Sequence, residues 1–485
     1  MTKYTILTGA TGLLGSFLLR DLMIEDVPVV TLVRSSRMET AAERVEGVLQ
    51  RFERQLGRAL PRPIVMECNL REPELGLTKD EKAWLSRHAD AMLHNAASLS
   101  FVETESGEPY KSNVDGTRNA LELCRAIGVR KFYHVSTAYV CGNRRELILE
   151  SDLIDKFGFG NDYEKSKFTA EKMVRETPWL DSVTVFRPAI IVGDSTTGYT
   201  STYHGFYAPM KILAPLVDPQ DVDVDGVAAF GEILGMNPND MKNFVPVDWI
   251  SRVMTAVVVN PRLHDETYHL TAGNRVSIGE MSRLIAEGIC RYKKPRTKAE
   301  QERAAEDMAK LLPTFHEQME VYRAYWRDDP EFDMTNTLRA VPQFPPVPMT
   351  ADQLLVFIRF AIESNFGWPK PKPTRIEFPV GAALESDEPM ADRAGANAFG
   401  LRVSGVGGGD WTIARADGAP LATRGLPVEA PLMTMNSRTF RAFCADRSVD
   451  ALAAKASWEG GAASEFKSAL ATLRELIATR NTTNL

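Results

Sequence analysis

Residues 4–15 read YTILTGATGLLG, an apolar strand followed by a glycine-rich turn and the start of a helix. Each glycine has its own role in such a turn. Gly9 allows the tight bend, Gly12 lets backbone N–H groups approach a pyrophosphate, and Gly15 lets the helix pack close to the sheet. The helix N-terminus adds partial positive charge. A glycine-rich surface turn is the alternative, but the position between a strand and an apolar-periodic helix favours a dinucleotide site.

The next strand indicates which dinucleotide is bound. Residues 27–33 read VPVVTLV, a buried strand, and Arg34 follows it directly. An acidic residue about 20 residues past the glycine turn would bind the ribose 2′-hydroxyl of NAD, whereas an arginine suits the 2′-phosphate of NADP. Arg37 and Arg44 are near in sequence and can add positive charge. An ordinary exposed loop arginine is the alternative, but the position of Arg34 favours NADPH.

The composition excludes several classes of protein. Of 485 residues, 44% are hydrophobic and 25% are charged, as in a globular chain of two or three domains. The net charge of −7 argues against a general nucleic-acid binder or a membrane-surface protein. We find no signal segment and no apolar run of about 18 residues, so we expect no transmembrane segment. Five scattered cysteines without metal-ligand spacing predict a cytoplasmic location and no metal site.

Apolar strands alternate with helical patterns over residues 1–190. Further strands are predicted at residues 64–67, 91–94, 131–136 and 182–187. Residues 113–127 have the apolar spacing of a helix between two of these strands. This alternation predicts an α/β fold with a doubly wound parallel sheet.

The composition changes along the chain and predicts a division into parts. In order, these are a Rossmann domain with lobe segments from about residue 190 (1–275), substrate-lobe helices (276–369), a Pro- and Lys-rich linker (370–380) and an α+β domain (381–485). A charged stretch at about 297–327 is predicted to be helical. In the last part, residues 411–414 read as a strand and residues 464–478 as an amphipathic helix.

A tyrosine and a lysine form the candidate catalytic pair. Tyr163 and Lys167 lie one helical turn apart on the same face. A phenol has a pKa of about 10, and a nearby ammonium group favours the phenolate, which brings this pKa toward the working pH. The pair can therefore act as a tuned proton donor. Tyr207 and Lys211 repeat the spacing, but Pro209 disfavours a continuous helix there, so we exclude that pair.

Polar or small residues follow two of the predicted strands. Ser136 and Thr137 end the fifth strand, where ligands of open α/β sheets bind and a hydroxyl can polarise a substrate oxygen. A strand-end turn is the alternative for this pair. His94 ends the fourth strand and is predicted to be a packed strand histidine, and residues 95–97 are small enough to leave room for a cofactor.

Taken together, these stretches resemble the extended short-chain dehydrogenases/reductases over about the first 275 residues. The matching segments, in order, are Thr8–Gly15, His94–Ala97, Asn113–Thr117, Val135–Val140, Tyr163–Lys167, Arg187–Pro188 and Asn243–Trp249. Within that family, residues 32–34 and 41–44 together with Val135–Val140 are similar to thioester reductases and fatty-acyl reductases. The resemblance implies a Rossmann fold and an NADP-dependent oxidoreductase.

The resemblance also implies which residues form the site. Thr137, Tyr163 and Lys167 would be the catalytic set, and Asn113 would hold a structural or proton-relay water. The implied cofactor-binding residues are Thr8, Gly9, Thr11, Gly12, Leu13, Leu14, Gly15, Arg34, Arg44, Asn69, Leu70, Asn95, Ala96, Ala97, Ser136, Tyr163, Lys167, Pro188 and Ile190. Arg34 and Arg44 would grip the 2′-phosphate.

Two positions depart from the family pattern. Asn69 and Leu70 stand where many relatives have Asp-Leu beside the adenine, and Cys141 stands where many have a tyrosine. The C-terminal part resembles the sterol-carrier-protein fold through residues 409–413, 432–440 and 458–461. That resemblance implies lipid binding, and a small accessory or dimerisation domain is the alternative.

We therefore predict an NADPH-dependent reductase of an acyl thioester, carried by coenzyme A or a carrier protein. The product is an aldehyde or, after a second reduction, an alcohol. Tyr163 would donate the proton, and Lys167 would hold the ribose and lower the pKa of Tyr163. A dehydrogenase or epimerase of a nucleotide sugar or a hydroxysteroid-like substrate uses the same residues and is the first alternative. A non-catalytic dinucleotide sensor or lipid-carrier scaffold is the second, and the intact catalytic set argues against it.

Overall fold

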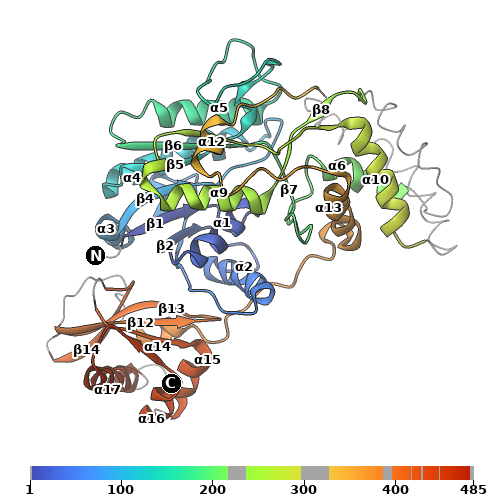
Figure 1. Ribbon diagram of the computed structural model, residues 1–485. Coiled ribbons are helices and arrows are strands. Elements are labelled where there is room, and N and C mark those ends of the chain that lie inside the picture. Colours follow the sequence, from blue (N-terminus) through green and yellow to red (C-terminus); the bar gives the residue numbers. More distant parts are fainter. Residues whose placement is uncertain are drawn as a thin grey trace.

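A parallel sheet forms the centre of the nucleotide-binding part. The computed structural model describes residues 3–216, 236–295, 327–385, 396–416, 418–427, 430–446 and 448–480. Seven strands pair in the order β10-β6-β5-β4-β1-β2-β3, all of them parallel (Figure 1). They are β1 (Tyr4–Thr8), β2 (Val29–Val33), β3 (Ile64–Glu67), β4 (Ala89–His94), β5 (Lys131–Val135), β6 (Ser182–Pro188) and β10 (Thr267–Leu270). The strand order reverses between β1 and β4, where open α/β sheets bind their ligands.

Helices cover both faces of this sheet and confirm the predicted doubly wound α/β fold. One face carries α1 (Leu13–Ile24), α2 (Ala41–Leu56) and α9 (Val247–Val259), and the other carries α3 (Lys79–His88), α4 (Gly116–Ile127) and α5 (Asp162–Arg175). Phe17, Leu49 and Val253 are buried in the first layer, and Trp84 and Leu121 in the second. Short helical turns are η1 (Pro73–Gly76), η2 (Lys111–Asp115), η3 (Ala138–Cys141), η4 (Pro261–Leu263) and η6 (Asn365–Gly367).

The substrate lobe is built from short strands and amphipathic helices. Its elements are β7 (Ile190–Val192), α6 (Tyr207–Leu216), β8 (Met241–Lys242), β9 (Phe244–Pro246), β11 (Val276–Ser277), α10 (Ile278–Tyr292), α12 (Thr335–Ala340) and α13 (Ala351–Glu363). The expectation that Pro209 prevents a helix is wrong, because proline is tolerated in the first turn, where an N–H group has no intrahelical acceptor. Tyr207 is nevertheless structural, since its buried phenol accepts a hydrogen bond from Gly193 N at 2.9 Å. The predicted charged helix at 297–327 lies outside the described residues except for Arg327.

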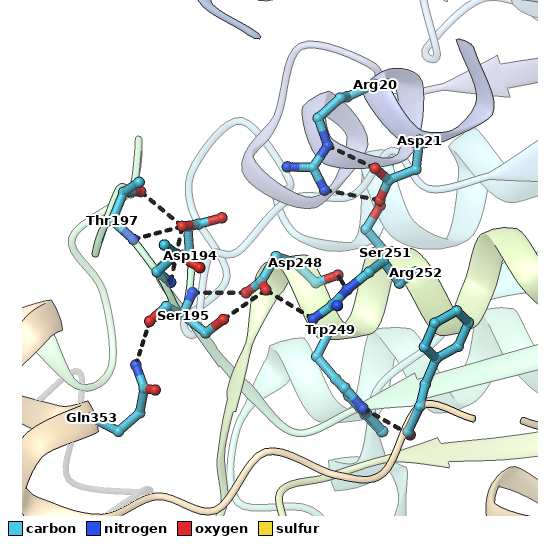
Figure 2. A network of polar contacts seen from close by, with 12 residues as sticks. Arg20, Asp21, Asp194, Ser195, Thr197, Asp248, Trp249, Ser251, Arg252 and Gln353 are labelled. Atoms are coloured by element: carbon cyan, nitrogen blue, oxygen red, sulfur yellow. Dashed lines mark hydrogen bonds and ion pairs between the residues drawn. The ribbon is translucent and has the colours of Figure 1, made fainter. Parts of the chain in front are cut away.

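A polar network joins the lobe to the sheet domain (Figure 2). Asp248, in the first turn of α9, accepts hydrogen bonds from the backbone N and the hydroxyl of Ser195 at 2.8 and 2.7 Å. Gln353 of α13 donates to the carbonyl of Ser195 at 2.8 Å. On the other side of α9, Ser251 donates to Asp21 of α1 at 2.5 Å. The network therefore holds the loop after β7 between the two parts of the molecule.

The C-terminal part is a mixed sheet covered by helices. Its strands, in sheet order, are β14 (Ala419–Arg424), β13 (Gly409–Ala416), β12 (Ala396–Ser404), β15 (Leu432–Asn436) and β16 (Ser457–Glu459). Its helices are α14 (Val380–Leu384), α15 (Ser437–Asp446), α16 (Val449–Ala453) and α17 (Ala463–Arg480). Val380 is fully buried in this core, so the core begins within the predicted linker. Tyr4 accepts a hydrogen bond from Leu426 N, and Arg402 pairs with Asp26, so this part contacts the N-terminal ends of β1 and β2.

Candidate active site

A cavity of about 670 Å³ opens at the carboxyl ends of the parallel strands. Its walls come from the turn after β1, the ends of β2, β4 and β5, the start of α5, and lobe residues such as Phe206 and Phe244. Every predicted cofactor-binding and catalytic residue lines this cavity except Asn113. The fold thus brings to one place residues that the sequence spreads from Thr8 to Ile190.

The glycine turn leaves room that side chains would fill. Gly9 has a φ of 71°, and a Cβ atom there would lie 2.8 Å from the backbone N of Ala96. A Cβ atom at Gly15 would lie 2.0 Å from the carbonyl oxygen of Gly9. Gly12 caps α1 without any side-chain hydrogen bond, so the N–H groups of the first turn face no side-chain cap. These features fit the pyrophosphate of a dinucleotide.

The turn after β1 is tied to the turn after β4. The hydroxyl oxygen of Thr8 accepts hydrogen bonds from the backbone N atoms of Asn95 and Ala96, both at 3.1 Å. It also lies 3.0 Å from Nδ1 of His94. His94 is a buried strand residue, as expected, and burial lowers its pKa to about 3. It therefore stays neutral and acts in packing and hydrogen bonding.

Two arginines stand at the end of the cavity beyond β2. Arg44 donates one hydrogen bond to the hydroxyl of Thr11 at 2.8 Å and another to the carbonyl of Arg34. Burial and the neighbouring charge of Arg34 lower the pKa of Arg44. The amide of Asn69 bonds within its own turn, donating to Glu72 at 2.8 Å and accepting from Arg71 N at 3.2 Å. The arginines thus form a cationic end that suits a phosphate group.

Thr137 and Tyr163 meet in the middle of the cavity. Thr137 precedes η3, and its hydroxyl donates to the carbonyl of Pro188 at 3.3 Å. It lies close enough to Tyr163 to lower the pKa of that phenol, an effect smaller than that of burial. The Tyr163 ring packs edge-on against Phe101, with centroids 6.0 Å apart. Burial raises the pKa of Tyr163 to about 12, so the phenol keeps its proton at neutral pH.

Lys167 is buried beside this pair. Its Nζ donates to the carbonyl of Val135 at 2.5 Å, and burial lowers its pKa to about 8. Burial is the largest influence on the pKa of Tyr163, and the lowering of that pKa by Lys167 stays a prediction. Burial thus lowers the pKa of Lys167, so its ammonium group loses a proton more easily.

Asn113 lies behind the cavity wall in η2. Its amide donates to the carbonyl of Ser98 at 3.1 Å and to the hydroxyl of Ser166 at 2.9 Å, and it accepts from Ser98 N at 2.7 Å. Both amide hydrogens are therefore used by protein groups, and the water that Asn113 would hold stays a prediction. Since Ser166 precedes Lys167 on α5, these bonds hold the catalytic helix to the loop after β4.

A sequence profile of the family described as "Male sterility protein" matches residues 7–254, just over half of the chain. The chain belongs to this NAD-binding family. This membership agrees with the resemblance to the extended short-chain dehydrogenases/reductases that the sequence showed.

Curated relatives are much longer than this family member. It is 30% identical over 281 residues to "L-2-aminoadipate reductase large subunit" of Penicillium chrysogenum, covering 53% of this chain and 18% of that one. It is 25% identical over 382 residues to "Non-canonical nonribosomal peptide synthetase hkm10" of Aspergillus hancockii, covering 72% of this chain and 35% of that one. The match therefore spans well under half the length of either relative.

Solved reductase domains share the fold of this family member. "The crystal structure of the terminal R domain from the myxalamid PKS-NRPS biosynthetic pathway" aligns with a TM-score of 0.57 and 24% identity, covering 77% of this chain and 93% of that one. A reductase (R) domain of a nonribosomal peptide synthetase from Mycobacterium tuberculosis aligns with a TM-score of 0.54 and 18% identity, covering 75% and 92%. These likenesses support the fold.

Sequence reasoning missed the lobe side of the site in this family member. Phe206, Ala208, Lys242, Phe244 and Met281 all line the cavity. They lie on or beside four elements, α6, β8, β9 and α10, that share no motif. The available signal was that Lys242 directly precedes the segment Asn243–Trp249. In the part of the chain that the structure describes, no three His, Cys, Asp or Glu side chains group as metal ligands. None of the described helices is long and apolar enough to cross a bilayer.

Proposed function

We propose that this protein reduces an acyl thioester with NADPH and releases an aldehyde and a free thiol. One observation carries the proposal: Thr137, Tyr163 and Lys167 line the same cavity as the glycine turn and the apolar lobe residues. Two similar proteins, whose names contain the word reductase, support this proposal. In balance, the thioester, NADPH and one proton give the aldehyde, the thiol and NADP⁺.

The cofactor would lie along the strand ends. The N-terminus of α1 and the turn at Asn95 would hold the pyrophosphate, and Arg34 and Arg44 would hold the 2′-phosphate. NADPH supplies the hydride when it is bound. We propose NADPH rather than NADH because an arginine, and not an acidic residue, follows β2.

The side chains of the catalytic set have separate tasks. Tyr163 remains protonated at neutral pH, so it can donate its proton to the oxygen of the carbonyl group as negative charge develops there. The hydroxyl of Thr137, which lines the same cavity as Tyr163, would hydrogen-bond the same oxygen. Lys167, with its ammonium group beside the carbonyl of Val135, would orient the ribose and stabilise the charge that the proton transfer leaves behind.

The acyl group would occupy the lobe end of the cavity. Phe206, Phe244 and Met281 make this end apolar, which suits an acyl chain better than a nucleotide sugar. The curated relative named as a nonribosomal peptide synthetase supports a thioester on a carrier protein, with coenzyme A as the simpler carrier to test. We also propose a cytoplasmic location, supported by five cysteines that are all free. Lipid binding by the C-terminal part stays a prediction, since the family match ends at residue 254.

The test is a coupled measurement of cofactor and thiol. Purified protein is given NADPH with an acyl-coenzyme A or an acylated carrier protein, and NADPH oxidation and thiol release are followed together. We expect equimolar loss of NADPH and gain of thiol for an aldehyde product, and two NADPH per thiol for an alcohol. Turnover of a secondary alcohol without thiol release would instead establish the dehydrogenase or epimerase alternative. NADPH binding without turnover of any of these substrates would favour the sensor.

A further inference from the structure

The cationic end of the cavity lies among acidic residues. Arg34 and Arg44 line the cavity, and Glu39 and Glu43 lie on the segment that joins them or on the first turn of α2. Glu39 is close enough to act electrostatically on the guanidinium group of Arg44. With Arg37, which lies on the same segment, three arginines face these two glutamates, so the group by itself carries only one net positive charge toward a phosphate dianion.

The segment that leads to the C-terminal part covers both glutamates. The backbone N of Thr374 donates to Glu39 at 2.7 Å. The guanidinium group of Arg375 donates to Glu43 at 3.0 Å and to the carbonyl of Met38 at 2.8 Å. Figure 1 shows this segment passing α2 on its way from α13 to the C-terminal sheet.

The contact is close-packed. A Cβ atom at Gly47 of α2 would lie 2.6 Å from the hydroxyl oxygen of Thr374, so the absence of a side chain there lets the segment approach the helix. Farther along, Gly407 N donates to Glu46 at 3.3 Å, which adds a contact from the C-terminal sheet to the same helix. The segment is therefore held against α2 at several points and not only by Arg375.

We propose that Thr374 and Arg375 are specificity-determining residues for the cofactor, because they neutralise the carboxylates that flank the 2′-phosphate site. Arg375 raises the net positive charge of this group by one, and the N–H of Thr374 satisfies Glu39. The segment that leads to the C-terminal part thus contributes to a site whose cavity it does not line. This inference rests on the proposed use of NADPH.

Cofactor binding without substrate tests the inference. We would measure dissociation constants of NADPH and NADH by calorimetry on the full chain, for the wild type, Arg375→Ala and the double variant Arg375→Ala/Glu43→Gln. We expect Arg375→Ala to weaken NADPH binding about two- to fivefold, the range of an exposed charge interaction, and to leave NADH unchanged. The double variant should recover NADPH binding, because the uncovered carboxylate is removed.

Controls separate this effect from a general loss of structure. Arg359→Ala removes another exposed arginine that pairs with a glutamate, Glu363, and should change neither constant. Raising the salt concentration should shrink the difference between the wild type and Arg375→Ala, because mobile ions screen exposed charges. Equal weakening of both cofactors, or no recovery in the double variant, would overturn the inference. A wild type that binds NADH as tightly as NADPH would overturn the proposed cofactor and this inference with it, whereas an NADPH preference unchanged in Arg375→Ala would overturn the inference alone.

Discussion

At the scale of single residues, burial sets the protonation state of the catalytic set. The pKa of Tyr163 is raised to about 12, and that of Lys167 is lowered to about 8. Tyr163 therefore keeps its proton throughout the usual assay range, while Lys167 changes charge within it. The group that limits the reaction at high pH is then the lysine.

This difference predicts the pH profile. The ratio kcat/KM, which reports the free enzyme, should fall about tenfold per pH unit above a pH of about 8, as Lys167 loses its proton. Below that pH the lysine is charged and its contribution is complete. Lys167→Met should lower kcat/KM and remove this fall at high pH, the alkaline limb of the profile. Lys165→Met changes an exposed neighbour and should leave the limb in place. A limb that persists in Lys167→Met would assign it to another group.

Tyr163→Phe isolates the proton donor. The phenol of Tyr163 is the only group changed, so we expect kcat to fall about 10²- to 10⁴-fold, the usual contribution of a general acid. The dissociation constant of NADPH should change little, because the glycine turn and the arginines are untouched. Stopped-flow turnover and fluorescence titration measure the two quantities. Turnover within about threefold of the wild type would refute the assigned role.

Residue types with a strict backbone requirement were predictable from the sequence. Gly9 and Gly15 stand where a Cβ atom would overlap the backbone. The spacing of these glycines in the sequence already indicated that no side chain fits there. The hydrogen bonds of Asn113 and the raised pKa of Tyr163 were not predictable, because both depend on neighbours far away in sequence. Burial is a property of the assembled fold, and local spacing does not report it.

At the scale of elements, an ion pair fixes helix α5 to the substrate lobe. Glu164, next to Tyr163, is fully buried and accepts from Arg327 at 2.9 Å and from Gly160 N at 2.9 Å. A Cβ atom at Gly160 would lie 2.8 Å from the Arg327 guanidinium group, so this glycine makes space for the ion pair. The start of α5 is thereby fixed from two sides.

Removing one partner should destabilise the protein strongly. Arg327→Met leaves the buried carboxylate of Glu164 without its cation. Breaking a buried ion pair in this way lowers the free energy of unfolding by about 3–5 kcal/mol. The double variant Arg327→Met/Glu164→Gln should recover part of the loss, because no unpaired charge remains. Chemical denaturation of the three proteins measures these free energies. A single variant as stable as the wild type would show that the ion pair does not hold the helix.

The sequence predicted some helices and strands better than others. The apolar strands β1 to β6 were predicted because several consecutive buried positions reveal them. The edge strand β10 was missed, since it has only four residues and three of them, Thr267, Tyr268 and His269, are not aliphatic. α6 was misjudged because Pro209 falls in its first turn, where proline is permitted.

At the scale of the whole molecule, the C-terminal part and the cavity lie at opposite ends of the parallel strands. The C-terminal part contacts Tyr4 and Asp26 at the N-terminal strand ends, while the cavity opens at the carboxyl ends. Among the contacts described here, the segment with Thr374 and Arg375 reaches toward the cofactor end. The arrangement separates the cavity, which the sheet domain and the lobe both line, from the attachment of the C-terminal part.

Because one cavity is shared by sheet domain and lobe, its two ends should respond separately to mutation. Ala208, on α6, is buried in the lobe wall near Phe206 and Met281. Ala208→Phe should fill space that a long acyl chain needs, and each displaced methylene group is worth about 0.8 kcal/mol. We therefore expect KM for a long-chain acyl-coenzyme A to rise about tenfold or more, with KM for acetyl-coenzyme A changed less than about threefold.

The dissociation constant of NADPH reports whether Ala208→Phe still folds, and it should match that of the wild type. Met281→Leu, a volume-conserving change in the same wall, serves as the control and should keep the preference for long chains. Steady-state kinetics over a series of chain lengths supplies the comparison. If Ala208→Phe impaired short and long chains equally, the acyl group would not lie against α6, and the apolar lobe end of the cavity would have another use.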